Sequence, residues 1–190
     1  GLSDYGGSNM NSVQYGLMMQ ELERGDSSLR SFVSVQSALV IYPILTYGSE
    51  EQKVRWLPRL CSGEVVGCFG LTEPDFGSNP AGMRTRAVKD GDYYILSGEK
   101  SWITSGSIAD LALIWARLDD SKKTVRGFLV EKGTPGFSVQ DIHGKYSMRA
   151  SISSSLSLSD ARVSAANMLP KAKGMMGPLS CLTQGRFGIG

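Results

Sequence analysis

Residues 71–78, with the sequence LTEPDFGS, and residues 102–104, with the sequence WIT, are the most informative stretches of this chain. Both place hydroxyl groups or glycines where a strand is expected to end or turn, and the second sets the indole of Trp102 beside a hydroxyl. A flat, hydrogen-bonding heterocycle needs an aromatic face to lie against, donors for its ring heteroatoms, and glycines where backbone must come close. The two stretches together therefore predict a pocket of the kind that holds a flavin ring.

Each stretch also has an ordinary structural interpretation. Residues 72–78 could be a strand leaving its sheet through a turn rich in Pro and Gly, and Trp102 could be a core indole. The joint occurrence of both stretches, with strand-like hydrophobic residues around them, favours the pocket. No G-x-G-x-x-G sequence follows an expected strand, so a dinucleotide site of the Rossmann type has no support.

The composition argues against several classes of partner and site. The chain has 20 Lys and Arg against 18 Asp and Glu, and a net charge of +2 gives no electrostatic footprint for nucleic acid or an anionic membrane. Cys61, Cys68, Cys181 and the single histidine, His143, lack the spacing of metal ligands, so we expect small buried thiols in a reducing compartment and no metal site.

Membrane and export signals are also not apparent. No apolar run approaches the length of a membrane span, and the first residues lack a basic region followed by a hydrophobic stretch. We therefore expect a soluble, intracellular protein, cytoplasmic in a bacterium or in the mitochondrial matrix of a eukaryote.

The first sixty or so residues have the periodicity of helices. Residues 26–28 (DSS) mark a helix start, Gly48 ends a helix, and residues 49–52 (SEEQ) form the capping box of the next, which Pro58 should kink or shorten. The apolar positions at helical spacing are Val13, Leu17, Met18, Phe32, Val33, Val35, Leu39, Val40, Val54, Trp56, Leu57 and Leu60.

Near Gly67 the period changes from about 3.6 to 2. The pair Asp90-Gly91 between two strand-like runs predicts a hairpin. Short strands without intervening helices suggest an antiparallel barrel or sandwich, which makes the fold class α+β. Further strands are expected over residues 111–117, 126–131, 137–142 and 152–158, and in the last of these Ile152, Ser154, Leu156 and Leu158 would share one face.

The chain divides into three expected parts. Residues 1–66 form a partial N-terminal helical domain, residues 67–170 a middle β-domain, and residues 171–190 a linker with the start of another helical domain. The first residues read as an internal loop, and the sequence stops before its last helix could bury an apolar face. We expect a fragment with residues missing at both ends.

These features resemble the acyl-CoA dehydrogenase family of flavoproteins. Residues 69–78 (FGLTEPDFGS) and residues 98–104 (GEKSWIT) match that family's two middle-domain signatures in sequence, order and separation. The likeness covers essentially the whole chain. It is greatest to the glutaryl-CoA branch of the family, through residues 21–37 (ELERGDSSLRSFVSVQS) and residues 145–151 (KYSMRAS).

The resemblance implies FAD as the cofactor of the middle domain. Trp102 would pack against the isoalloxazine ring, and Thr104 would offer its hydroxyl near the reactive ring nitrogen. Phe69, Leu71 and Thr72 would line the flavin through backbone groups and one side-chain hydroxyl. Such hydrogen bonds tune the electron affinity of a flavin.

The resemblance also implies contacts to the CoA thioester. Ser78 would contact its pantetheine or phosphate portion, and Asn79 stands where the family usually has Asp, which removes a charge beside that contact. Arg186 lies in a segment similar to the family's first C-terminal-domain helix, whose Arg lies near CoA.

Arg30 is the residue that bears on the choice of substrate. An arginine on a helix is commonly a solvated surface charge. By resemblance, however, Arg30 with Ser31, Glu23 and Ser34 would recognise the distal carboxylate of a dicarboxylic acyl-CoA. Glu23 and Arg30 are seven positions apart, two turns along one helix face, so both can address one site.

The implied reaction has two linked parts. A carboxylate base removes the proton alpha to the thioester carbonyl while the beta hydrogen leaves as hydride, and with glutaryl-CoA the product loses CO2 to give crotonyl-CoA. Electrons would pass to an electron-transfer flavoprotein. The family's catalytic Glu lies in the C-terminal domain, so we expect no catalytic residue in this chain and do not nominate Glu23, Glu73 or Glu99.

Two further expectations follow from the missing domain. The family's homotetramer contributes C-terminal residues to a neighbour's FAD, so this chain alone should be inactive and should bind FAD poorly. Two alternatives remain open: a dehydrogenase for another short-chain acyl-CoA, with Arg30 an ordinary helix charge, and a truncated paralogue that acts as a binding or assembly module.

Overall fold

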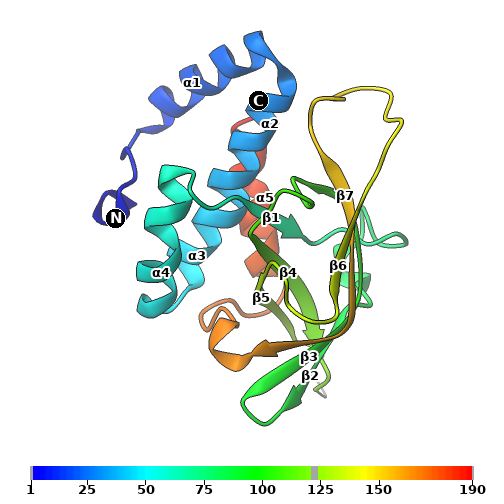
Figure 1. Cartoon of the computed structure of the whole chain (residues 1–190). Coiled ribbons are helices and arrows are strands. Elements are labelled where there is room, and N and C mark those ends of the chain that lie inside the picture. Colours follow the sequence, from blue (N-terminus) through cyan, green and yellow to red (C-terminus); the bar gives the residue numbers. More distant parts are fainter. Residues whose placement is uncertain (1, 121–123, 190) are drawn as a thin grey trace.

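The computed structural model describes residues 2–120 and 124–189, and Gly1 and Gly190 lie outside the described residues. Figure 1 shows the helices of the N-terminal part, in blue to cyan, on one side of a curled sheet, with the last helix, in red, packed beside them. The architecture confirms the α+β fold class and the order of a helical part, a β-domain and a further helix.

The helices are separated by short connections. They are η1 (Leu2–Tyr5), α1 (Ser12–Gly25), α2 (Ser27–Ser34), η2 (Val35–Ile41), α3 (Tyr42–Tyr47), α4 (Glu50–Ser62), η3 (Pro80–Gly82), η4 (Ala165–Asn167) and α5 (Met176–Phe187).

Capping residues set the helix boundaries as the sequence predicted. Asp26 caps α2 by accepting a hydrogen bond from the backbone N–H of Ser28, and Gly48 follows α3. Ser49 and Gln52 form the capping box of α4. The expected shortening by Pro58 is wrong, because α4 continues past it to Ser62.

The apolar face expected on α1 does not reach the core. Val13 and Leu17 are 70% and 58% exposed, and Met19 is the buried residue of this helix. Helical spacing located the helix correctly, but spacing alone does not show which face of the helix packs against the core.

The segments α2, η2 and α3 form one continuous helical run, Ser27–Tyr47, whose middle seven residues are a π-helix. This run of 21 residues reaches a mean hydropathy of 1.3, so by length and composition alone it could cross a membrane. The expectation that no apolar run approaches such a length is therefore wrong. Core helices of folded domains have the same composition, and Val40, Ile41 and Ile44 of this run are buried in the cluster that joins the helices to the sheet.

The sheet has seven strands in the order β1-β4-β2-β3-β7-β6, with β5 paired to β4. The predicted hairpin is confirmed, since β2 and β3 pair across Gly91. The strands are β1 (Gly67–Gly70), β2 (Arg86–Asp90), β3 (Tyr93–Thr104), β4 (Leu111–Leu118), β5 (Val125–Glu131), β6 (Phe137–Asp141) and β7 (Ser153–Ser164).

The sheet is mixed, not antiparallel throughout as predicted. Strand β4 pairs in parallel with both β1 and β2, and the remaining pairs are antiparallel. Parallel neighbours need a long connection, and the chain between β1 and β4 supplies one by passing through the loop at residues 71–85 and the β2–β3 hairpin.

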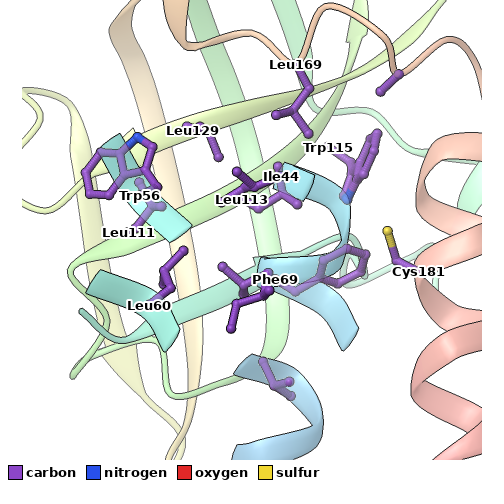
Figure 2. Close-up of a cluster of buried hydrophobic side chains, with 14 of the residues drawn as sticks. Ile44, Trp56, Leu60, Phe69, Leu111, Leu113, Trp115, Leu129, Leu169 and Cys181 are labelled. Carbon is purple, nitrogen blue, oxygen red and sulfur yellow. The ribbon is translucent and has the colours of Figure 1, made fainter. Parts of the chain in front are cut away.

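Both faces of the sheet carry a hydrophobic core. On β4, Leu111, Leu113 and Trp115 face the helices, while the alternate residues, such as Ile114, belong to a second cluster with β3, β5 and β7. Figure 2 shows the first cluster, in which Phe69 and Cys181 lie near Trp115. A strand buried on both faces has no polar alternation, which explains the unbroken apolar run of β4.

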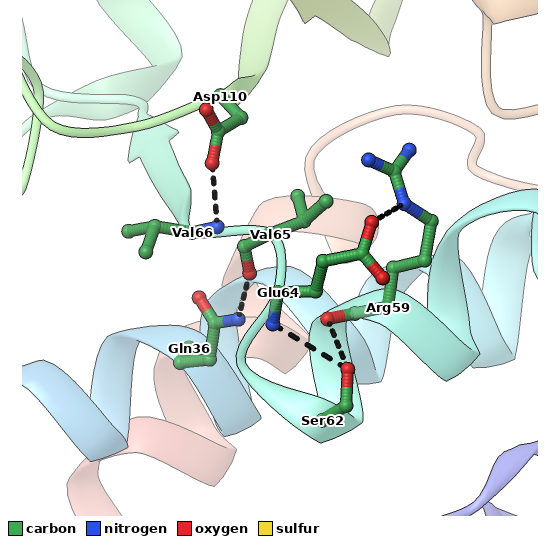
Figure 3. Close-up of polar contacts among 7 residues, drawn as sticks. All are labelled: Gln36, Arg59, Ser62, Glu64, Val65, Val66 and Asp110. Carbon is green, nitrogen blue, oxygen red and sulfur yellow. Dashed lines mark hydrogen bonds and ion pairs between the residues drawn. The ribbon is translucent and has the colours of Figure 1, made fainter.

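The connection from α4 to β1 is held by hydrogen bonds from both sides, as Figure 3 shows. The amide of Gln36 in η2 donates to the carbonyls of Leu60 and Val65 at 3.1 and 2.8 Å and accepts from the N–H of Gly67 at 2.9 Å. Asp110 accepts from the N–H of Val66 at 3.0 Å. Gln36 thus fixes the place where the helical part meets the first strand.

Candidate functional site

The two sequence stretches that predicted a ring pocket lie side by side. The backbone N–H of Ser101 in β3 donates to the carbonyl of Thr72 at 2.9 Å. A cavity of about 290 Å³ opens between them and the helices η2 and α5. Its lining residues include Val35, Leu39, Phe69, Leu71, Thr72, Ser78, Trp102, Thr104, Leu179, Leu182 and Arg186. All five residues predicted to hold the cofactor, together with Ser78 and Arg186, therefore border one space.

Trp102 presents its indole to this cavity and to solvent. The side chain is 63% exposed, whereas Trp56 and Trp115 are 4% and 0% exposed, so the interpretation of Trp102 as a core residue is wrong. Its backbone has φ of +61°, and the β3–β7 register shifts between Lys100 and Ile103. A bulky residue in this left-handed region is strained by about 1–3 kcal/mol, and such strain occurs at functional sites.

Several polar groups that line the cavity have no hydrogen-bond partner in the described part of the chain. The hydroxyls of Thr72, Ser78 and Thr104 make no hydrogen bond to any residue of the described ranges, and neither does the guanidinium of Arg186. Apolar walls with a few free donors are what a small-molecule site requires.

A buried ion pair that was not predicted as a site feature lies behind this cavity. Lys100 Nζ is 2.9 Å from Glu73 Oε1, and the two side chains are 0% and 4% exposed. Glu73 also accepts hydrogen bonds from the backbone N–H groups of Arg84 at 2.6 Å and Thr85 at 2.9 Å. The visible signal was Lys100 within the signature at residues 98–104, and its partner could not be read from the sequence.

The surroundings of the pair shift both pKa values. Burial pushes the pKa of the Glu73 carboxyl upward, but Lys100 and the hydrogen bonds from Arg84 and Thr85 outweigh it and hold this pKa below its usual value. Burial lowers the pKa of Lys100 to about 8, against the opposing effect of Glu73. The Glu73 carboxylate is thus held ionised by three donors.

Arg30 and Glu23 meet at a second, more open cavity. Arg30 Nε donates to Glu23 Oε2 at 2.7 Å, and Ser27 Oγ donates to Glu23 Oε1 at 2.6 Å. The Arg30 side chain is 14% exposed, which argues against a solvated surface charge. Its two Nη groups have no hydrogen-bond partner within residues 2–120 and 124–189, so they remain available to a ligand.

The loop between β6 and β7 completes this cavity of about 770 Å³. Ser147, Met148, Arg149 and Ala150 line it opposite the α1–α2 junction. Arg149 was not predicted as a site residue, because no local pattern places that loop against residue 30. Ser31 and Ser34 do not line this cavity, and Ser34 is only 5% exposed.

The three thiols lie outside both cavities, and two of them, Cys68 and Cys181, are buried. Burial raises the pKa values of Cys68 and Cys181 to about 12, and Cys61 is half-buried with a raised pKa. All three are free thiols. In the described part of the chain, no three side chains of His, Cys, Asp or Glu gather as metal ligands would.

Comparison with known proteins assigns the family. Residues 3–64 match the acyl-CoA dehydrogenase N-terminal domain, and residues 68–161 match the acyl-CoA dehydrogenase middle domain.

The chain belongs to the acyl-CoA dehydrogenase family.

Similar acyl-CoA dehydrogenases differ in the acyl group that their names give. A glutaryl-CoA dehydrogenase from Mycobacterium smegmatis, in complex with FADH2, has 58% identity and a TM-score of 0.94 over 97% of this chain and 47% of that one. Butyryl-CoA dehydrogenase from Megasphaera elsdenii has 34% identity and a TM-score of 0.92 over 98% of this chain and 51% of that one. Mitochondrial isovaleryl-CoA dehydrogenase from Pongo abelii is 37% identical over 87% of this chain and 40% of that protein. The chain therefore spans about half the length of these relatives.

The acyl-CoA dehydrogenase cavity in this chain fits a flavin ring. It has an exposed indole face, free hydroxyls on two walls and a volume of about 290 Å³, at the small end for ligand sites. That volume suits the ring system and leaves the nucleotide part of a dinucleotide outside the cavity.

Proposed function

We propose that this chain forms the cofactor wall and the substrate-selecting side of an FAD-dependent acyl-CoA dehydrogenase that acts on glutaryl-CoA. The choice of substrate rests on the environment of Arg30. Its side chain is mostly buried, Glu23 orients the guanidinium through Nε, and both Nη groups are free. The products would be crotonyl-CoA and CO2, with electrons passed to an electron-transfer flavoprotein.

Five residues would hold the cofactor in this proposal. Trp102 would lie against the ring, Thr104 and Thr72 would donate hydroxyl hydrogen bonds, and backbone at Phe69 and Leu71 would line its edge. When bound, FAD supplies the acceptor for the hydride that leaves the beta carbon. The protein tunes that chemistry through the hydrogen bonds and the electrostatics of this wall.

Arg30 would select the acyl group. An arginine whose Nε is already engaged can still bind a carboxylate end-on through its two Nη groups, in two parallel hydrogen bonds. The Glu23 carboxylate fixes the guanidinium plane before substrate arrives, which lowers the entropy cost of binding. A site built for a charged group rejects analogues that lack it, because its own charge is then left unpaired in a partly desolvated pocket.

Ser78 and Arg186 would contact the CoA portion, since both line the cofactor cavity at its loop and α5 sides. The proton alpha to the carbonyl needs a base, and the proposal assigns this task to none of Glu73, Glu23 and Glu99. Glu73 is buried in an ion pair, Glu23 is engaged by Arg30 and Ser27, and Glu99 is an exposed strand residue. We therefore propose that the chain alone is inactive and that its partners include further copies in a tetramer.

The test is turnover by the complete protein that carries this chain, supplied with FAD, an artificial electron acceptor, and glutaryl-CoA or butyryl-CoA. We expect glutaryl-CoA to be preferred, with crotonyl-CoA and CO2 as products. Preference for butyryl-CoA would favour the alternative of another short-chain acyl-CoA, which the butyryl-CoA and isovaleryl-CoA relatives support.

The same experiment on residues 1–190 alone tests the expected inactivity. Robust turnover by this chain would contradict it. A colourless, stable monomer with no flavin uptake in the complete protein would instead favour the binding or assembly module. An intracellular location, cytoplasmic or in the mitochondrial matrix, is part of the proposal, and fractionation of cells would test it.

A further inference from the structure

The ion pair of Glu73 and Lys100 joins the two signature stretches at one buried point. Glu73 lies in the loop that follows β1, and Lys100 lies in β3, two positions before Trp102. Lys100 Nζ donates to Glu73 Oε1 at 2.9 Å and to the carbonyl of Leu71 at 3.1 Å. One of these two acceptors, the Leu71 carbonyl, belongs to a residue that lines the cofactor cavity.

The Glu73 carboxylate closes the loop that carries Ser78. Its two oxygens accept the backbone N–H groups of Arg84 and Thr85, at 2.6 and 2.9 Å. At the near end, Glu73 and Phe76 exchange backbone hydrogen bonds in a tight turn. Residues 77–80 are thereby held between two fixed points, and Gly77, Ser78 and Pro80 from this segment line the cofactor cavity.

Lys100 holds the other wall. The register of β3 against β7 is irregular between Lys100 and Ile103, and Trp102 within this irregularity has φ of +61°. A strained backbone persists only where its surroundings over-determine it. The anchoring of Lys100 to Glu73 and Leu71, with the Ser101 N–H bonded to the Thr72 carbonyl, supplies that constraint immediately before Trp102.

Stability alone is a poor reason for this arrangement. Two charges buried at 0% and 4% exposure lose their hydration, and well-packed apolar side chains often replace such a pair without loss of stability. What an apolar pair cannot do is bind two backbone N–H groups and a carbonyl in fixed directions. The geometry is therefore better explained by positioning than by stabilisation.

We propose that Glu73 and Lys100 are positioning residues that set the spacing between the ring-facing segment at Trp102 and Thr104 and the loop segment at Thr72 and Ser78. Neither side chain touches the cavity, so the pair acts through the residues it holds. The inference rests on the proposed function, because it takes a flavin ring as the group that this spacing serves.

The experiment compares Glu73→Gln, Lys100→Met and the double variant in the complete protein that carries this chain. Each single variant leaves one buried group without its ionic partner and should unfold at a lower temperature. The double variant removes both charges, so its midpoint should return to within about 4 °C of wild type. Its FAD affinity should nevertheless remain about tenfold or more below wild type, since Glu73→Gln offers one acceptor oxygen in place of two to Arg84 and Thr85, and Lys100→Met removes the donor to the Leu71 carbonyl.

A control separates positioning from general loss of stability. Leu158→Ala lies in the core cluster on the far face of the sheet and should lower the unfolding temperature with FAD affinity unchanged. Hydrogen exchange of the ligand-free chain gives a readout that needs no cofactor. In the double variant, faster exchange confined to residues 72–85 and 100–105 supports the proposal.

The outcomes are distinct. A double variant with wild-type unfolding temperature, wild-type FAD affinity and unchanged exchange in these segments would overturn the positioning role and leave the proposed function intact. FAD affinity that falls equally in Leu158→Ala would also overturn it. Wild-type protein that takes up no FAD at all would overturn the proposed function, and this inference with it.

Discussion

The backbone of Gly67, at the start of β1, lies against the side chain of Val40 in η2, where a β-carbon on residue 67 would be 2.5 Å from Val40 Cγ1. Only a residue without a side chain allows strand and helix to approach this closely. Because β1 leads into the loop that borders the cofactor cavity, this contact sets how far the helical wall stands from the sheet wall.

Gly67→Ala should therefore destabilise the chain. The added methyl group has to displace Val40 from a packed core, which costs about 1–3 kcal/mol in the free energy of unfolding. Urea unfolding followed by tryptophan fluorescence measures it. Gly16→Ala is the control, because nothing lies within 4 Å of a β-carbon at Gly16 in α1, and this change should be neutral or stabilise by up to about 1 kcal/mol. Equal effects of the two substitutions would contradict the close contact.

Substitution of Gln36 should lower the free energy of unfolding as much as substitution of a core hydrophobic residue. Gln36→Leu removes the partner of two carbonyls, at Leu60 and Val65, and of the Gly67 N–H, and should lower the free energy of unfolding by at least about 2 kcal/mol. Gln36→Glu keeps the shape but cannot donate to the carbonyls, so it should also destabilise. The exposed Gln20 provides the control, and a Gln20→Leu change within about 0.5 kcal/mol is expected.

Local features of the fold could be predicted from the sequence because their causes are local. The capping residues Asp26 and Ser49, and the turn at Gly91, act within a few positions and appear as expected. The parallel pairing of β4 and the exposure of Val13 depend on contacts with segments that are distant in the sequence. The spacing of apolar residues within one element does not show which distant segment packs against it.

The candidate site was predictable in part for the same reason. The residues of the cofactor cavity belong to two short signatures, so their shared location followed from the resemblance. Arg30 does contact Glu23, but the predicted reason, two turns along one helix face, is wrong, because the two residues lie on successive helices, α1 and α2, that meet at Asp26. The cavity contribution of Arg149 and the pairing of Glu73 with Lys100 join segments far apart in sequence and needed the structure.

Trp102→Asn should raise the stability of the ligand-free chain and weaken FAD binding. Asn accepts the left-handed backbone with less strain than Trp, and the 63% exposed indole loses little burial, so the ligand-free chain should gain up to about 1 kcal/mol. FAD titration of the complete protein that carries this chain should show weaker binding, because the aromatic face is lost. Trp102→Phe keeps both the strain and an aromatic ring and should remain close to wild type in both measurements. An Asn variant with undiminished FAD affinity would remove Trp102 from the ring wall.

Arg30 should govern the preference for a carboxylate-bearing acyl group. Arg30→Ala in the complete protein should lower kcat/KM for glutaryl-CoA by about 100-fold or more and leave butyryl-CoA little affected, since the charged contact is lost only to the former. Arg30→Lys should recover only part, because an ammonium cannot form the two parallel bonds. Arg24→Ala removes an exposed ion pair with Glu21 and should leave the preference unchanged. An intact preference in Arg30→Ala would refute the carboxylate role.

Acid should release the loop that Glu73 closes. The folded pKa of this carboxyl is held below its usual 4.5, so its contribution to stability is present above pH 4.5 and is lost as the pH falls through the folded value. Amide exchange at Arg84 and Thr85, corrected for intrinsic rates, should accelerate over that interval. The Ser101 amide bonds to a backbone carbonyl and serves as the internal control. The step should be absent in Glu73→Gln, and protection of residues 84 and 85 that persists until global unfolding would contradict the prediction.

The π-helix η2 affects how far the helical run Ser27–Tyr47 turns between α2 and α3. Each residue of an α-helix turns the chain by about 100°, and a π turn accommodates an extra residue within otherwise α-helical neighbours. Deleting one residue from the seven of η2 would let this stretch return to α geometry with nearly the same total turn, so Arg30 would keep its direction relative to α3, whose Pro43 and Ile44 are held in the core. The helical run can thus differ by one residue in length without redirecting the cation proposed to select the substrate, while both walls of the cofactor cavity keep their sequence.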